Sequence, residues 1–271
     1  MASAPLQGLP LFYNDLVPLS SAVHGDWRLR GIEGAPFLRE AHAVPLLSEE
    51  ILLAHRHYPV VFSAGDNPVP LALMGLNEGV NTFVDERGLF PDGVYVPAYV
   101  RRYPFMLARL RPDTDDLSLC FDPSSEVVGA YEEGDAIFED GKPSGRVQEI
   151  LQFCESFEQS SQATAAFVGE LMSQKLMMEG EFSVQLGDGG TPAPGQPAPP
   201  GQPAPYVYRG FQMISEEALR NLRGDVARKW IQNGILPLIY AHLFSLNHMG
   251  EIFGRQQAQG KLPPVNGPQL A

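Results

Sequence analysis

The chain has few cysteines and few basic residues for its length. Its 271 residues include two cysteines, Cys120 and Cys154. These are too few for a disulfide framework or a thiolate metal site, so we expect two thiols in a reducing compartment, with a single disulfide as the alternative. Lysine and arginine number 19 against 32 acidic residues, and the formal net charge is −13. Because this charge would repel phosphates, we expect no nucleic acid partner.

Long apolar runs are also missing. No stretch reaches the roughly 18 apolar residues of a membrane span, and residues 1–15 have neither a basic region nor the apolar run of a secretory signal. We therefore expect a cytoplasmic protein without a membrane span, and leaderless export to the cell surface is the alternative. Hydrophobic residues still make up 44% of the chain, which is enough to bury a sizeable core.

The common signatures of catalysis are not found. The sequence contains no G-x-S-x-G, Walker, G-x-G-x-x-G or H-E-x-x-H motif. His242 and His248 are weak metal-ligand candidates, because a two-histidine site would need a carboxylate from elsewhere in the chain. We predict no catalytic residue and no cofactor, and we expect each histidine to be an ordinary core or surface residue.

An acidic segment runs from Pro112 to Gly141 with ten acidic residues and no lysine or arginine. It lacks the D-x-D-x-D-G spacing of a calcium loop. The segment predicts a solvated loop with a short helix around Glu132 to Phe138.

The densest part of the sequence is the stretch from Tyr58 to Leu107. Three runs of β-forming residues, Val60 to Ser63, Val69 to Leu76 and Thr82 to Val84, are separated by residues that favour turns. This spacing predicts an antiparallel meander. Leu117 to Phe121 is a candidate partner strand for the extended segment that ends the stretch.

The second half of the chain predicts a hairpin and helices. Glu181 to Leu186 and Tyr206 to Ile214 alternate as strands. Residues 187–205 are rich in proline and glycine and predict a flexible insertion at the hairpin tip. Arg146 to Met178 is the longest amphipathic helical pattern, and shorter patterns lie between Asp225 and Met249.

These elements predict one α+β domain. Its antiparallel sheet combines the central meander with the C-terminal hairpin, and the long helix and C-terminal helices cover the sheet. We place the domain at residues 11–253 and expect residues 254–271 to be a disordered tail.

The best candidate for a ligand site is a cluster of arginines and tyrosines. Arg101 and Arg102 lie between Tyr99 and Tyr103 and close to Tyr95. Two guanidinium groups among aromatic rings can bind a carboxylate or a phosphate. The alternative is structural: with 32 acids in the chain, the arginines could pair with Asp85 or with the acidic segment.

Two motifs carry a family resemblance. YVPAYVRRYPF, residues 95–105, and IYAHLFSL, residues 239–246, are similar to the bacterial SapC-like proteins, and the resemblance extends over roughly residues 11–246. The family is named for a gene associated with surface-layer loci and their secretion genes. Many members are encoded near outer-membrane receptors and flavin-dependent halogenases. The resemblance implies no established activity and no set of catalytic residues.

Composition, motifs and resemblance together lead to a hypothesis about function. We expect a non-enzymatic accessory or binding protein linked to surface-layer or cell-envelope biology, which recognises a peptide or a small acidic ligand. One alternative is a metal-dependent or peptide-modifying enzyme, associated with oxygenase chemistry, that uses His242 with an acidic residue. A structural component of the surface layer is the second alternative.

Overall fold

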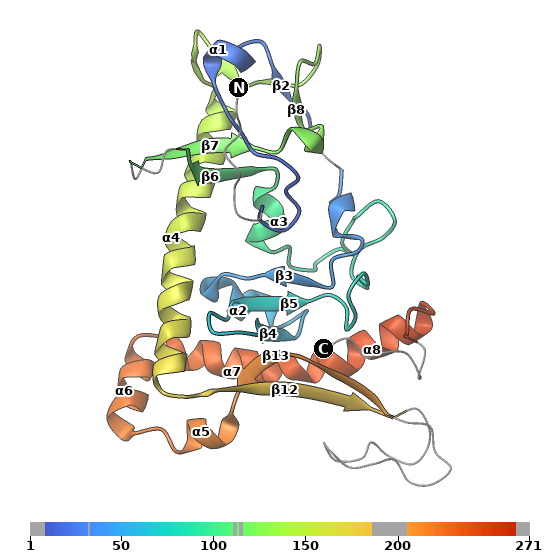
Figure 1. The fold of residues 1–271 in the computed structure, drawn as a ribbon, viewed down its shortest axis with the longest axis vertical. Coiled ribbons are helices and arrows are strands. Elements are labelled where there is room, and N and C mark those ends of the chain that lie inside the picture. Colours follow the sequence, from blue (N-terminus) through green and yellow to red (C-terminus); the bar gives the residue numbers. More distant parts are fainter. Residues whose placement is uncertain (1–8, 32, 111–112, 114–115, 186–204, 264–271) are drawn as a thin grey trace.

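The computed structural model describes residues 9–31, 33–110, 113, 116–185 and 205–263. The expected insertion at 187–205 lies outside these residues apart from Pro205, and so does the end of the chain from residue 264. The described residues form an α+β fold of antiparallel sheets and helices (Figure 1).

The largest sheet joins the meander to the C-terminal hairpin, as expected. Its strand order is β12 (Met177–Val184), β13 (Tyr206–Ile214), β4 (Val60–Ser63), β5 (Pro70–Leu73), β3 (Ala43–Pro45). All neighbours are antiparallel, and the hairpin meets the meander where Phe211 pairs with Ser63 and Gln212 pairs with Phe62. The third expected meander strand, Thr82 to Val84, does not form. The amide N–H of Thr82 instead donates to Met74 O as part of a loop.

A second sheet of three strands has the order β1 (Val17–Pro18), β7 (Leu117–Phe121), β6 (Phe105–Arg109). The predicted pairing of Leu117–Phe121 with the end of the central stretch is therefore confirmed, with Leu107 opposite Leu119. Smaller units are the sheet β8 (Val128–Gly129), β2 (Arg28–Leu29), β9 (Asp135–Ala136) and the pair β10 (Phe138–Glu139), β11 (Lys142–Pro143).

The predicted helix around Glu132 to Phe138 is wrong. This segment contains β9 and β10, and Ile137 between them is buried. Its extended backbone is fixed by distant partners, because Ala136 pairs with Arg28 and the Ile137 amide donates to Trp27 O. Gly134, at φ +123°, also cannot continue a helix.

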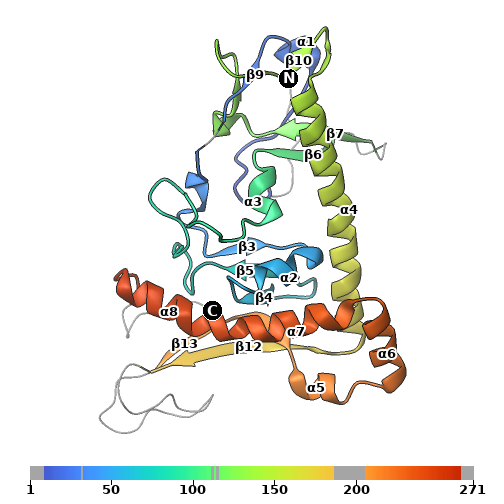
Figure 2. The ribbon, with the colours of Figure 1, turned by 180° about the vertical axis from the view of Figure 1, so that it is seen from behind.

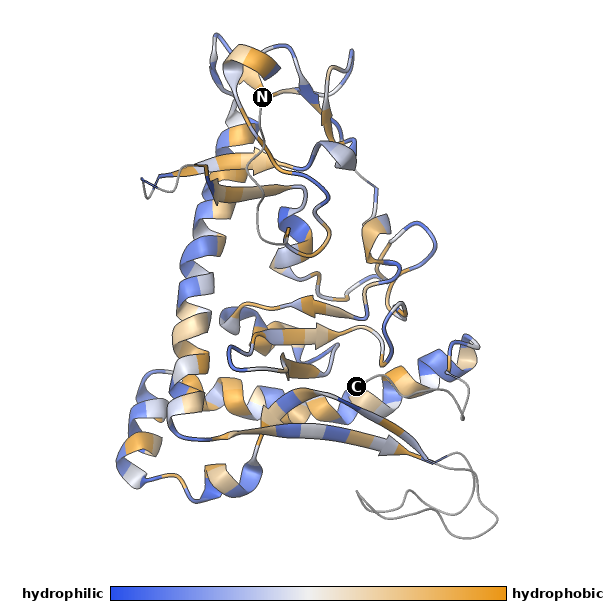
Figure 3. Ribbon diagram, in the orientation of Figure 1, coloured by the Kyte–Doolittle hydropathy of each residue, from blue (hydrophilic) through white to orange (hydrophobic). Residues whose placement is uncertain are grey.

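The longest helix is α4 (Gly145–Ser173), which runs along one side of the molecule over most of its height in Figures 1 and 2. The Ser144 side chain caps it by accepting from Val147 N. Hydrophobic and hydrophilic residues are mixed along its length (Figure 3). The expected end at Met178 is wrong: Lys175 has a left-handed φ of +54°, and β12 begins at Met177.

Short helices complete the N-terminal half. They are α1 (Ser21–His24), α2 (Ile51–Ala54) and α3 (Ala98–Arg102), with single 3-10 turns at Pro36–Leu38, Ser48–Glu50 and Pro123–Ser125.

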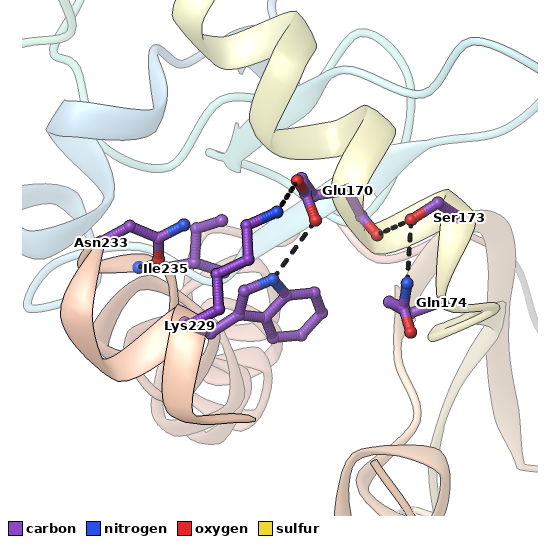
Figure 4. A network of polar contacts seen from close by, with 7 residues as sticks. Glu170, Ser173, Gln174, Lys229, Asn233 and Ile235 are labelled. Carbon is purple, nitrogen blue, oxygen red and sulfur yellow. Dashed lines mark hydrogen bonds and ion pairs between the residues drawn. The ribbon is translucent and has the colours of Figure 1, made fainter. Parts of the chain in front are cut away.

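The C-terminal helices are α5 (Glu216–Arg220), α6 (Gly224–Gln232), α7 (Ile235–Ser245) and α8 (Met249–Ala258), with a 3-10 turn at Leu246–His248. Glu170, near the end of α4, links this helix to α6 (Figure 4). Its carboxylate accepts hydrogen bonds from Lys229 Nζ at 2.6 Å and from Trp230 Nε1 at 3.4 Å. The prediction that the chain is disordered from residue 254 is wrong for residues 254–258, because α8 continues to Ala258 and buries Gln256.

Two hydrophobic cores lie along α4. The larger core fills the space around the five-stranded sheet, α2 and α7, and it includes Phe167 and Leu171 of α4. The smaller core lies around β6 and β7 and includes Val147 and Cys154 of α4. Cys154 and Cys120 are both free and buried, and burial raises the pKa of each thiol to about 11. Among the described residues, no helix has the length and apolar character needed to cross a membrane.

Candidate functional site

A buried carboxylate positions the segment that carries the predicted site. Glu50 is buried, and its Oε1 accepts from the Ala98 amide and from the Tyr95 hydroxyl, both at 2.6 Å. Its other oxygen accepts from Leu47 N at 2.8 Å. Burial and the bond to Glu50 raise the pKa of Tyr95 to about 12, so this phenol stays protonated. Glu50 thereby fixes both Tyr95 and the start of α3.

The helix α3 sends its two arginines to different environments. Neighbouring residues on a helix point about 100° apart. Arg101 is exposed, and it donates from Nε to Val96 O at 3.1 Å and from Nη2 to Tyr95 Oη at 3.4 Å. Its guanidinium lies 5.3 Å from the ring centre of Phe153 and forms no ion pair with any acid among the described residues.

Arg102 is 7% exposed and lies in an aromatic cage. Its guanidinium carbon is 4.1 Å from the ring centre of Phe157 and 4.5 Å from that of Tyr99. Its Nη1 is 3.5 Å from Glu158 Oε1, and its Nε has no hydrogen-bond partner among the described residues. The structural alternative therefore applies to Arg102, but the acid is Glu158 of α4. Asp85 lies instead 4.0 Å from Arg87.

Beside Arg101 the surface opens into a cleft of about 750 Å³, which we call the arginine cleft. Its walls are largely apolar: they include Phe37, Phe90, Val96, Val100, Phe105, Ile150 and Phe153. Its charged residues are Arg30, Arg101, Arg102, Arg146, Asp135 and Glu149.

The charge of the arginine cleft is positive once its ion pairs are set aside. Arg146 pairs with Glu149 at 2.9 Å, and Arg102 is held by Glu158. Arg30 stacks on Tyr131 at 3.6 Å from the ring centre. Arg30 and Arg101 thus outnumber the remaining acid of the cleft, Asp135. An apolar cleft of this size with two available guanidinium groups can hold an anionic organic ligand.

The five predicted ligand residues do not share one site. Arg101, Arg102 and Tyr103 line the arginine cleft. Tyr99, together with Arg102, lines a separate groove along α4. Tyr95 lines neither cavity, but its hydroxyl oxygen accepts a hydrogen bond from Arg101.

Sequence reasoning missed Arg30 and Phe153 as cleft residues and Glu50 as the residue that positions α3. Arg30 lies just after β2 and Phe153 lies on α4, far from Arg101 in the sequence. The amphipathic pattern of α4 was the only signal at Phe153, and that pattern cannot say what the helix faces.

The two weak metal-ligand candidates, His242 and His248, form hydrogen bonds with the backbone. His242 is fully buried; its Nδ1 donates to Val60 O at 2.7 Å, and its Nε2 accepts from Ile214 N at 3.1 Å. Burial lowers the pKa of His242 to about 4. His248 donates from Nε2 to His55 O at 3.1 Å, and its Nδ1 lies 3.1 Å from a Glu251 oxygen without hydrogen-bond geometry. In the described part of the chain, no group of three or more His, Cys, Asp or Glu residues is placed to hold a metal ion.

Comparison with known proteins gives a family and nothing closer. No curated protein and no solved structure matches the chain. The SapC family model matches residues 19–252, which covers both cores, α3 and the arginine cleft. The chain therefore belongs to the SapC family.

Proposed function

We propose that this protein is a non-enzymatic accessory protein that binds an acidic ligand, either a peptide or a small organic acid, in the arginine cleft. The observation that carries this proposal is the environment of Arg101. Its guanidinium is exposed beside an aromatic wall and has no carboxylate partner among the described residues, although the chain contains 32 acidic residues.

The chemistry of the cleft supports a carboxylate ligand with an apolar body. A guanidinium group binds a carboxylate through two parallel hydrogen bonds, and it keeps its charge at every physiological pH. Arg101 is held at its Nε by Val96 O, which leaves most of its Nη donors for a ligand. The rings of Phe37, Phe90 and Phe153 offer apolar contact beside this charge.

Two further parts of the proposal rest on the family and on chemistry, respectively. We place the protein in surface-layer or cell-envelope biology, because that is the setting implied by the family. We favour binding over catalysis because both ring nitrogens of His242, the histidine of the enzyme alternative, are bonded to the backbone. Cell fractionation tests the remaining alternative, because a structural layer protein would be abundant outside the cell.

The test compares Arg101→Ala and Arg30→Ala with Arg228→Ala, which removes an exposed arginine of α6 outside the cleft. The probes are benzoate, N-acetyl-phenylalanine and an acidic peptide with aromatic residues, measured by calorimetry at two salt concentrations. We expect at least one probe to bind to the unmodified protein, and Arg101→Ala to weaken that binding about tenfold or more, equivalent to about 1.4 kcal/mol.

Arg102 is left unchanged in this test, because its truncation would leave Glu158 without its partner and disturb the fold. Arg228→Ala should bind as the unmodified protein does. The proposal is wrong if no probe binds, or if Arg101→Ala and Arg228→Ala bind equally well.

A further inference from the structure

A second cavity lies along α4, separate from the arginine cleft. This α4 groove has a volume of about 670 Å³. The α4 residues that line it are Phe157, Glu158, Ser161, Thr164, Ala165, Val168, Gly169 and Met172. The opposite wall comes from Pro45 to Leu47, the turn from Asp66 to Pro70, and Met106 and Leu107 of β6. Arg101 does not line it.

The shape of the α4 groove suits one extended chain. At a rise of 1.5 Å per residue, the face of α4 from Phe157 to Met172 is about 22 Å long. Division of the volume by this length gives a mean cross-section of roughly 30 Å². An α-helix with its side chains is about 10–12 Å across, so only part of it would lie within a groove of this cross-section. An acyl chain or an extended peptide fits.

At one end of the α4 groove lies the buried guanidinium of Arg102, whose Nε has no hydrogen-bond partner among the described residues. Tyr99, Phe157 and Glu158 line this groove and not the arginine cleft, and they are also the closest contacts of the Arg102 guanidinium. The 3.5 Å distance to Glu158 is longer than the roughly 2.7–2.9 Å of a charge-assisted hydrogen bond. Arg102 Nε is one of five buried side-chain atoms without a hydrogen-bond partner in the described part of the chain, and such an atom calls for a specific explanation.

The other end of the α4 groove is open. Val69 and Met172 at its rim are 43% and 38% exposed. Gly169 lies in the interior of α4, where glycine is less favourable than alanine. No atom lies within 4 Å of the place its Cβ would occupy, so no protein neighbour requires a glycine there. The open space above Gly169 keeps the groove accessible.

From these features we infer that the α4 groove binds the carboxylate end of one extended apolar chain. The carboxylate pairs with Arg102, and the apolar chain runs toward Val168 and Met172. Asp66 at the turn disfavours the opposite orientation through charge repulsion. Glu158 competes with the ligand for Arg102, and its half-exposed side chain can turn toward solvent.

A fatty acid and the C-terminus of an apolar peptide share this chemistry, and the test separates the two sources. The probes are dodecanoate with dodecanamide, and an apolar hexapeptide as the free acid and as the C-terminal amide. Six extended residues span about 20 Å. Binding is measured by calorimetry on the full chain. We expect one of the two acids to bind, and its amide to bind at least tenfold more weakly.

Two pairs of variants locate the binding. Gly169→Leu fills the groove and should reduce binding at least tenfold, whereas Gly254→Leu makes the same change at an open position in α8 and should have no effect. Glu158→Gln removes the competing charge and should strengthen binding severalfold, whereas Glu155→Gln, on an exposed part of α4, should not. Helical circular dichroism and the melting temperature check that each variant is folded.

The tests of the two proposed binding sites are independent. Gly169 does not line the arginine cleft, and Arg101 does not line the α4 groove, so each variant reports on one site. The inference is overturned if neither acid binds, if each acid and its amide bind equally, or if Gly169→Leu binds as the unmodified protein does.

Discussion

His242 shows how one side chain can replace a missing part of a sheet. Strands β13 and β4 pair directly only at Phe211 and Gln212. Beyond these residues the imidazole of His242 lies between the strands, where it accepts from Ile214 N and donates to Val60 O. The nearby Ser245 hydroxyl accepts from Val60 N at 2.8 Å. Two residues of α7 thus satisfy backbone groups that would otherwise be buried without partners.

This role of His242 makes stability depend on pH. Its pKa is about 4 in the folded protein and about 6.5 in an unfolded chain, so the unfolded state binds more protons between these values. Stability should therefore fall as the pH is lowered from about 6.5 to about 4, and this residue should contribute a loss of about 3 kcal/mol. Urea unfolding at several pH values across this range measures the loss of stability.

The matched variant is His242→Asn, whose amide does not titrate. It should be less stable at neutral pH by about 1–3 kcal/mol, because a hydrogen bond to the backbone is lost. Its stability should also change less between pH 6.5 and pH 4 than that of the unmodified protein. Equal slopes for the two proteins would contradict the role given to His242.

At the scale of elements, the hairpin of β12 and β13 depends on a close contact that local propensity does not reveal. Gly180 lies opposite Phe211, and the register shifts between Gly180 and Phe182. A Cβ at position 180 would lie 2.0 Å from the ring of Phe211, so the ring occupies the space that any other residue would need. Phe211 packs in turn against the larger core.

Gly180→Ala should therefore destabilise the protein by about 1–3 kcal/mol, because the Phe211 ring must move out of its packed position. Gly254→Ala, at an open helical position, should be neutral or stabilising. Phe211→Leu in the Gly180→Ala background should restore part of the loss. Denaturant unfolding of the two single variants and the double variant measures the coupling, and additive effects would refute the contact.

The elements that could be predicted from the sequence are those with a local signal. Extended patterns marked β6, β7 and β13, and the amphipathic period marked α4. The two-residue strands β8 and β9 were missed, because both pair with Arg28 and Leu29 and have no pattern of their own. In the candidate site, the arginines among aromatic residues marked Arg101. The separation of Arg102 from Arg101 could not be predicted, since it depends on where α4 packs.

At the scale of the whole molecule, α4 joins the two hydrophobic cores. Val147 and Cys154 belong to the smaller core, whereas Phe157, Phe167 and Leu171 belong to the larger one. The three-stranded sheet lies beside the first half of this helix and the five-stranded sheet beside the second half (Figures 1 and 2). A continuous helix transmits the unfolding of one core to the other, so we expect the unmodified protein to unfold in one transition.

A proline shortly after Phe157, the first larger-core residue of α4, tests this coupling. Gln159 is exposed, and Gln159→Pro removes the hydrogen bond to residue 155 and costs about 3 kcal/mol in the helix interior. Each core contains one tryptophan as a reporter: Trp27 packs against the smaller core and Trp230 lies in the larger one. With Trp27→Phe or Trp230→Phe, fluorescence follows one core at a time. Gln159→Pro should give two separate midpoints and Gln159→Ala one, because only proline interrupts the helix. Coincident midpoints in the proline variant would mean that contacts outside α4 couple the cores.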